Sequence, residues 1–303
     1  MKYTSAAAFR QALEQRLKNE ATSTGLGLAR LRKQVAFELF LRRLLIVAPD
    51  HWVLKGALAL NFRLAIATRA TKDIDLGRDD DEQAAIGDIT AAQQLALDDH
   101  FTFAATRTHE LDDTDEFSAV RFHVTAQLAG RTFEQFLLDI GFTDTISWTP
   151  DIIHTSGSLS FAGIQPLSVP VIPIPQHLAE KVHAYTRTYG ETNQPSTRPK
   201  DLIDILLIES TTTIQADALR HALQSTFTER ARQPLPVSLP PPPTAWTDPY
   251  KRLAVTVRIE SDLHAAYTRA AAFLDPILAG HANGQWDPQH HHWIATEDSP
   301  AKP

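Results

Sequence analysis

Residues 69–76 read Arg-Ala-Thr-Lys-Asp-Ile-Asp-Leu, and this stretch decides the fold. From Asp73 to Leu76 polar and apolar side chains alternate, which is typical of a half-buried strand. Residues two apart on a strand point the same way, so the carboxylates of Asp73 and Asp75 leave one face while Ile74 and Leu76 are buried on the other. Two neighbouring carboxylates repel each other unless a cation holds them. Mg²⁺ (or Mn²⁺) is the natural cation, because it takes oxygen ligands and bridges carboxylates to substrate phosphates. The alternative is an acidic surface strand without a metal.

The sequence upstream of the acid pair is suited to binding phosphate. Residues 54–57 read Leu-Lys-Gly-Ala and predict a strand that enters a helix through glycine. Free N–H groups at a helix start bind phosphate, and Gly56 allows a triphosphate to approach closely. Arg69 can pair with phosphate oxygens and Thr71 can donate its hydroxyl. We therefore expect Lys55, Gly56, Arg69 and Thr71 to bind a nucleotide. The alternative is an ordinary strand–helix turn with a solvated arginine.

A third carboxylate, Asp139, follows the alternating residues of a strand expected over 132–140. If that strand lies beside the strand of Asp73 and Asp75, Asp139 joins the pair. Three acids can hold one or two metal ions, one of which activates the attacking hydroxyl while the other neutralises a leaving pyrophosphate. The alternative is an acid that faces water at a strand end.

The pattern of the first 150 residues predicts a mixed sheet with helices packed on it, an α/β (α+β) fold. Expected strands cover 52–54, 73–76, 117–128 and 132–140, and expected helices cover 5–20, 28–47, 57–67 and 82–99. Residues 150–175 are rich in proline and β-branched residues, which indicates an extended connector or an edge strand. We expect a first domain with basic N-terminal helices over 1–150, a mainly helical domain over 151–282 and a flexible tail over 283–303.

The helical half is expected to contain helices over 176–189, 199–210, 215–229 and 249–279, with a stiff proline-rich spacer over 234–243. Two of its residues carry chemistry. Lys181 lies beside an apolar helical stripe, and Asp201 follows Arg-Pro-Lys at the start of the next helix. Lys181 can reach nucleotide phosphates while Asp201 orients it. The alternative is a well-capped surface helix, because a proline and an acid are both favoured in a first turn.

Composition excludes several classes of site. The 303 residues have a net charge of −7 and contain no cysteine, so disulfides, zinc–thiolate sites, iron–sulfur clusters and thiol catalysis are absent. No apolar run is long enough to span a membrane, and we expect a cytoplasmic protein. Residues 1–72 contain 13 Lys or Arg against 4 Asp or Glu, whereas residues 73–116 contain 14 acids against 2 Arg. A basic face beside an acidic site can bind a polyanion together with a metal ion. The alternative is two solvated faces of opposite sign.

The ordered set of motifs resembles the AbiEii nucleotidyltransferase toxins, a group that includes the mycobacterial MenT toxins. The motifs span about residues 30–230, in the order 55–60 (Lys-Gly-Ala-Leu-Ala-Leu), 69–76, 179–181 (Ala-Glu-Lys) and 198–204 (Arg-Pro-Lys-Asp-Leu-Ile-Asp). The family usually has two small glycine-like residues after the first lysine. Here the second is Ala57, which puts the detail of that phosphate contact in question.

The resemblance implies a polymerase-β-like fold, the toxin half of a toxin–antitoxin pair with a cognate antitoxin, and often a role in phage defence. It implies an NTP substrate and transfer of a nucleotide to an RNA 3′ end, such as the acceptor end of tRNA, which blocks translation. By position, Asp73 and Asp75 match the metal-binding acids, and Lys181 and Asp201 match a downstream catalytic pair. Asp139 fits the third acid.

Three hypotheses follow. In the first, the basic N-terminal helices hold tRNA and an NMP passes to its 3′-hydroxyl. In the second, the same fold nucleotidylates or phosphorylates a protein hydroxyl, for example in the antitoxin. In the third, the chain is a binding module with a degraded site. The full set of acids argues against the third hypothesis, and the charge of residues 1–72 favours RNA over a protein acceptor.

Overall fold

The computed structural model describes residues 2–64, 69–108, 119–142, 148–189, 194–230 and 233–295. The chain divides into two compact units. The first comprises residues 1–63 and 70–172, and the second comprises 64–69 and 173–303. A short segment between two elements of the first unit thus belongs to the second unit. The ends of the helix expected over 57–67 and of the strand expected from 117 lie outside the described residues.

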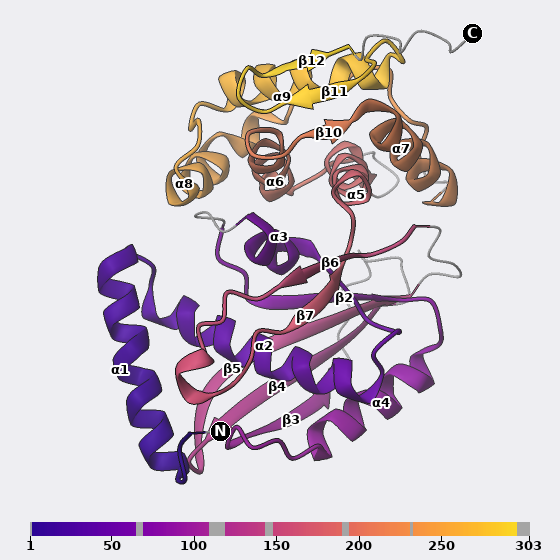
Figure 1. Ribbon diagram of the computed structural model, residues 1–303. Coiled ribbons are helices and arrows are strands. Elements are labelled where there is room, and N and C mark those ends of the chain that lie inside the picture. The colour runs from indigo at the N-terminus through magenta and orange to yellow at the C-terminus, as the bar shows by residue number, and fades with distance from the viewer. Residues whose placement is uncertain are drawn as a thin grey trace, which may run out of the picture. The chain divides into compact units, whose positions relative to one another are not determined.

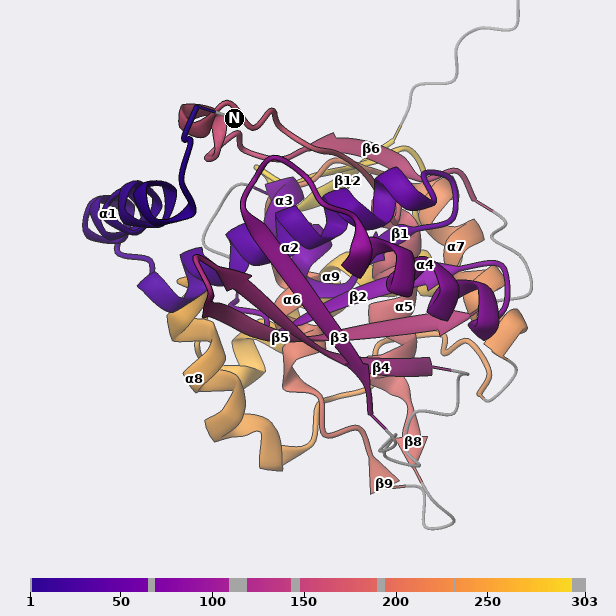
Figure 2. The same cartoon turned by 90° about the horizontal axis from the view of Figure 1, so that it is seen from below.

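The first unit is built on a seven-stranded mixed sheet (Figure 1). The strands follow the order β3-β4-β5-β2-β1-β7-β6, with β2 parallel to β5 and β1 parallel to β7. Figure 2 looks towards the β3 edge of this sheet. The predicted mixed α/β fold is confirmed. The strands are β1 (Val53–Lys55), β2 (Asp73–Arg78), β3 (Phe101–Arg107), β4 (Ala119–Leu128), β5 (Arg131–Phe142), β6 (Asp151–His154) and β7 (Ser168–Val171).

Helices on one face of the sheet close the core of this unit (Figure 1). Phe37 and Phe40 of α2 lie 5.0 and 5.8 Å, ring centre to ring centre, from Phe136 of β5. Side-chain oxygens of Ser5 and Asp81 cap the first turns of α1 and α4. The opposite face of β2 and β5 carries Asp73, Asp75 and Asp139, together with Leu137. The helices are α1 (Ala6–Thr24), α2 (Leu28–Val47), α3 (Gly56–Leu64), α4 (Glu82–Gln94) and the 3₁₀ turn η1 (Ser160–Ala162).

The hairpin between β4 and β5 contains an extra residue. Ala129 and Gly130 form its turn, both with positive φ (54° and 68°). Gln127 pairs with Thr132, but the preceding residue of β4 pairs with Glu134, so Phe133 is left over as a β-bulge. The bulge shifts the register by one residue for the rest of the hairpin. It also allows Phe133 to be buried although it lies an odd number of positions from the other core residues of β5.

The second unit contains five α-helices in its described part, and α5 packs against α6 and α7. The single helix predicted over 249–279 is two helices, because Arg258 adopts a left-handed conformation (φ 59°) that ends α8, and Asp262 caps α9. The helices are α5 (Ile174–Thr186), α6 (Pro199–Glu209), α7 (Ala216–Arg230), α8 (Thr247–Val257), α9 (Leu263–Leu278) and the 3₁₀ turn η2 (Thr244–Trp246). A short ribbon is formed by β8 (Thr188–Tyr189) and β9 (Gln194–Pro195).

The segment expected as a flexible tail begins with an ordered hairpin, which corrects that expectation. Strand β11 (Gln285–Asp287) pairs with β12 (His292–Ile294) on one side and with β10 (Ile214–Gln215) on the other. Trp286 is buried, and its Nε1 donates to the carbonyl of Glu209 over 2.8 Å. The Glu209 carboxylate, also buried, meets Arg269 at 2.6 Å and His291 at 2.7 Å. An aromatic anchor and an ion pair thus fix residues that show no periodicity in sequence. Residues 296–303 lie outside the described residues.

None of the described helices is both long and apolar enough to cross a membrane.

The predicted proline-rich spacer packs onto the second unit, since Leu239 is buried and its carbonyl accepts from the Tyr267 hydroxyl at 3.0 Å. One strand of the sheet, β3, was not expected from the sequence, although Phe101 and Phe103 alternate with polar or small residues.

Candidate active site

The two acids of β2 lie on one face of the sheet, as their spacing predicts. Asp73 and Asp75 are half-buried, whereas Ile74 and Leu76 are buried in the core on the other face. The Thr71 hydroxyl accepts from the Asp73 amide at 3.3 Å and donates to the Asp73 carbonyl at 3.1 Å. Thr71 therefore fixes the backbone at the start of β2. Its expected contact with a phosphate stays a prediction.

Asp139 lies beside Asp75 on the neighbouring strand. Strand β5 runs parallel to β2, and Asp75 and Asp139 are register partners. Lys55 of β1 is the partner of Asp75 on its other side, and Arg121 of β4 is the partner of Asp139. Four charged residues, Lys55, Asp75, Asp139 and Arg121, thus form one row across four strands, which we call the charged row.

The Arg121 side chain binds both carboxylate oxygens of Asp139. Its Nε donates to Oδ1 at 2.6 Å and its Nη2 to Oδ2 at 2.8 Å. Such a two-pronged pair is among the strongest side-chain hydrogen-bonded contacts. The prediction placed Asp139 with the metal-binding acids, but in this structure both of its oxygens are engaged by a guanidinium.

Gly56 is required by the position of Asp75. It has φ +62° at the start of α3, and a Cβ built on it would lie 1.8 Å from Oδ2 of Asp75. No side chain other than hydrogen fits there. The Asp75 carboxylate therefore rests against the backbone where β1 enters α3. Nearby, a Cβ on Gly77 would lie 2.9 Å from Cδ of Lys55, so the lysine stem lies over that glycine.

The donor set on β2 fits a hard divalent cation. Two carboxylates on one face supply oxygen ligands of the kind that Mg²⁺ and Mn²⁺ prefer, and these ions complete their coordination with water and substrate phosphates. Within the described ranges, no three His, Asp or Glu side chains are grouped so as to hold a metal. The residues present thus fit a cation bound by Asp73 and Asp75, rather than one caged by three protein ligands.

The second unit brings Lys181 and Asp201 together, together with a carboxylate that the sequence analysis did not single out. Lys181 Nζ lies 3.2 Å from Oδ1 of Asp201 and 2.9 Å from Oδ2 of Asp204. All three side chains are buried. Burial alone would lower the pKa of Lys181, but the charges of Asp204 and Asp201 outweigh it and raise that pKa above its ordinary value. Lys181 is a fully paired ammonium.

Arginines complete this cluster. Arg69 binds Asp204 through Nε and Nη2 at 2.9 and 3.0 Å, and Arg198 Nε donates to Asp201 at 2.7 Å. Burial would raise the pKa values of Asp201 and Asp204, but Lys181 and the arginines hold both below the usual range. Arg69 was expected to pair with phosphate, and here its guanidinium fork is held by Asp204.

Lys200 differs from these cations. It is half-buried beside the cluster, and among the described residues no hydrogen-bond or ion-pair partner contacts its ammonium. Burial and the neighbouring charges of Arg198, Arg69 and Lys181 lower its pKa, and Asp201 only partly opposes this. Among the described residues, Lys200 is thus the cation of this cluster whose ammonium is available for an anion.

Several basic residues of the N-terminal helices make contacts within the first unit, and one of them, Arg43, is too buried to belong to the expected RNA-binding face. Arg43 is buried and forms two hydrogen bonds of 2.7 Å with Asp99. Arg32 meets Glu14 at 2.6 Å, and Arg42 donates to the carbonyl of Gln165. Lys33 and Arg10 likewise contact β5 or its turn. These contacts join residues that are far apart in sequence, and binding of RNA by the N-terminal helices stays a prediction.

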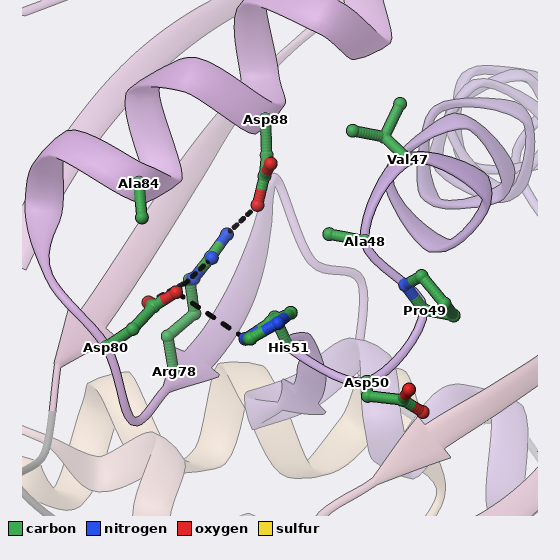
Figure 3. Close-up of a pocket in the computed structure, with 9 residues that line it drawn as sticks. All are labelled: Val47, Ala48, Pro49, Asp50, His51, Arg78, Asp80, Ala84 and Asp88. Carbon is green, nitrogen blue, oxygen red and sulfur yellow. Dashed lines mark hydrogen bonds and ion pairs between the residues drawn. The ribbon is translucent and has the colours of Figure 1, made fainter.

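A separate cavity of about 410 Å³ lies at the end of β2, on the helix-covered side (Figure 3). Arg78 stands in it, bound to Asp80 and, at 2.7 Å, to Asp88, with its guanidinium 4.0 Å from the Trp52 ring centre. His51 lies 3.5 Å from Asp80. None of the predicted site residues lines this cavity. Its arginine is fully used in joining β2 to α4, so its role is structural.

Three of the charged residues described above were not predicted: Arg121 in the first unit, and Asp204 and Lys200 in the second. A signal for Asp204 was present, since residues three apart on a helix share a face and Asp201 and Asp204 both follow Pro199 in α6. The sequence around Arg121 carried no such signal, because its partner is fixed by the register of the hairpin.

Comparisons with known proteins identify the family and relate the fold to solved structures. The family model of the nucleotidyl transferase AbiEii toxin, a type IV toxin–antitoxin system component, matches residues 39–282. The structure is similar to MenT4, a nucleotidyltransferase toxin from Mycobacterium tuberculosis, with 18% identity, a TM-score of 0.53 and coverage of 88% of this chain and 98% of that chain. JHP933 from Helicobacter pylori is 14% identical over 82% of this chain and 93% of its own, with a TM-score of 0.45. A search of curated proteins gave no significant match. The family model covers most of the chain, and the protein therefore belongs to the AbiEii nucleotidyltransferase toxin family.

Proposed function

We propose that this toxin transfers a nucleoside monophosphate from an NTP to the 3′-hydroxyl of an RNA, with the acceptor end of tRNA as the target. Membership of the family makes the chain a nucleotidyltransferase and implies an NTP substrate, a divalent metal and a cognate antitoxin. The acceptor, the identity of the metal as Mg²⁺ and the consequence, a block of translation, belong to the proposal. A role in phage defence is part of the same expectation.

The acid pair on β2 carries the proposal. Asp73 and Asp75 share one face, Thr71 fixes the first of them and Gly56 leaves room for the second. When bound there, Mg²⁺ would neutralise charge on the triphosphate and favour loss of pyrophosphate. The two carboxylates hold that ion and, through it, the nucleotide. The cavity at Arg78 offers no comparable pair, because its carboxylates are bound to that arginine.

The reaction balances without a further reactant. The acceptor oxygen attacks the α-phosphorus of the NTP, the bond from that phosphorus to the bridging oxygen breaks, and pyrophosphate leaves. The hydroxyl proton passes to water. In the second unit, Lys200 supplies an ammonium for phosphate oxygens, while Lys181, held by Asp201 and Asp204, keeps that cluster in shape.

The support for RNA rests on the resemblance, since the N-terminal cations are engaged in the fold. Lys72, which directly precedes Asp73, remains exposed and can contact a phosphate backbone. A protein hydroxyl is the competing acceptor, and it is an outcome of the same test.

The test incubates the purified protein with tRNA and each of the four α-³²P-labelled NTPs in Mg²⁺. We expect label on tRNA with at least one nucleotide, and no label on tRNA whose 3′ end has been oxidised by periodate. Asp75→Asn should abolish transfer, whereas Asp98→Asn, at an exposed acid outside the site, should leave it unchanged. Label on protein would assign the competing acceptor. Folded protein that labels neither with any NTP would overturn the proposal.

A further inference from the structure

Arg121 is paired with Asp139, the acid that was expected as the third metal ligand. The guanidinium fork covers both oxygens of Asp139, and the two side chains are 32% and 22% exposed. They face each other across β4 and β5 as register partners, so the backbone holds them together. The pair is a built feature of the sheet rather than a chance contact of two mobile side chains.

The order of charges in the charged row determines whether Asp139 is available to a metal ion. Asp75 and Asp139 occupy neighbouring positions on adjacent parallel strands, which lie about 4.8 Å apart. Two carboxylates at that spacing either share a cation or repel each other. Arg121 supplies a cation to Asp139 from the side away from Asp75. A metal ion that bound Asp139 would have to compete with a guanidinium that already occupies both oxygens.

We propose that Arg121 is a positioning residue that keeps Asp139 out of the coordination of the divalent cation, so that without nucleotide the toxin binds one cation through Asp73 and Asp75. This inference rests on the metal role proposed for the β2 acids. It departs from the three-acid arrangement expected from the sequence. Asp139 and Arg121 then form a neutral unit on the sheet face, and Asp139 contributes shape rather than a metal ligand.

The test measures Mn²⁺ binding by electron paramagnetic resonance on the full chain, without NTP or acceptor. Asp75→Asn should weaken Mn²⁺ binding at least 10-fold, whereas Asp139→Asn should change it less than 2-fold. Arg121→Met uncovers Asp139 and should tighten Mn²⁺ binding at least 5-fold. The double variant R121M/D139N should return to the affinity of the native protein. A loss of folding cannot tighten metal binding, so the last two results separate positioning from stability.

Arg107→Gln is the control. It removes an arginine of the neighbouring strand β3 whose partner, Glu82 of α4, is not a residue of the site. It should leave Mn²⁺ binding unchanged. If Asp139→Asn weakens Mn²⁺ binding as much as Asp75→Asn, or if the native protein binds two ions without nucleotide, the inference is wrong. If R121M does not fold, the Asp139→Asn result alone decides. Failure of the proposed function has a different signature, which is an absence of labelled product while these affinities remain as expected.

Discussion

Replacing Gly56 by alanine tests whether the backbone at the start of α3 positions Asp75. The added Cβ would lie 1.8 Å from Oδ2 and 2.6 Å from Cγ of Asp75. Ordinary contact requires the carboxylate to withdraw by about 1.5 Å. A displacement of about 1 Å in a reacting arrangement costs about 100-fold in rate, which corresponds to about 2.7 kcal/mol. We therefore expect kcat for nucleotidyl transfer to fall about 100-fold or more in Gly56→Ala.

The change also forces alanine into a left-handed conformation, and this part of its effect needs its own control. Gly25 has a similar φ of +73°, but a Cβ built there meets nothing within 4 Å. Gly25→Ala should therefore cost about 1–2 kcal/mol in the free energy of unfolding and nothing in kcat. Urea denaturation measures the first quantity and the labelled-tRNA assay measures the second.

The result that would refute this reasoning is specific. If Gly56→Ala keeps kcat within about 3-fold of the native value, Asp75 either does not act from the observed position or moves without consequence. If Gly25→Ala loses as much activity as Gly56→Ala, the loss reflects backbone strain in general rather than the carboxylate.

Three further outcomes are expected. Lys200→Met should raise KM for the NTP about 10-fold with a smaller change in kcat. The reason is that it removes the one described ammonium of the Lys181 cluster that has no partner. An unchanged KM in the transfer assay would exclude this role. Burial, with the charges of Arg230 and Arg187, lowers the pKa of His183 to about 4. Below about pH 6.5 the unfolded chain therefore binds a proton that the folded chain does not, and the stability of the second unit should fall as pH decreases from about 6.5 to 4. His183→Phe should flatten that slope in urea unfolding followed by circular dichroism. Trp286→Ala should destabilise the second unit by about 3–5 kcal/mol, since it empties a buried site and removes the bond to Glu209, whereas Trp293→Ala, at a partly exposed ring, should cost clearly less in the same measurement.

Local pattern predicted the elements whose periodicity is unbroken, and it predicted the shared face of Asp73 and Asp75. The long helix expected over 249–279 was wrong at one point, because Arg258 adopts a conformation that its sequence neighbours do not demand. The place of Arg43 in the basic face was wrong for a different reason. Arg43 is buried by an ion pair with Asp99, 56 residues away, and no local pattern reports a partner at that distance.

The same distinction between local pattern and long-range contact applies to the candidate site. Lys181 and Asp201 were singled out from the helical pattern and from the resemblance, but their contact depends on how α5 packs on α6. The pairing of Arg121 with Asp139 could not be obtained from the sequence. Counting back from the turn at Ala129 and Gly130 without a bulge would set Arg121 opposite Leu138. Only the extra residue, Phe133, sets it opposite a carboxylate.

The same surplus residue makes an exposed turn intolerant of changes in length. Turn tips are usually where a chain accepts insertions and deletions. Deleting one residue here would slide the two strands past each other by a single position, and such a slip exchanges the inner and outer faces of a strand. Asp139 would point into the hydrophobic interior and Leu138 would take its place in the charged row. Homologous chains should therefore vary freely in the residue types of this turn but hardly ever in its number of residues.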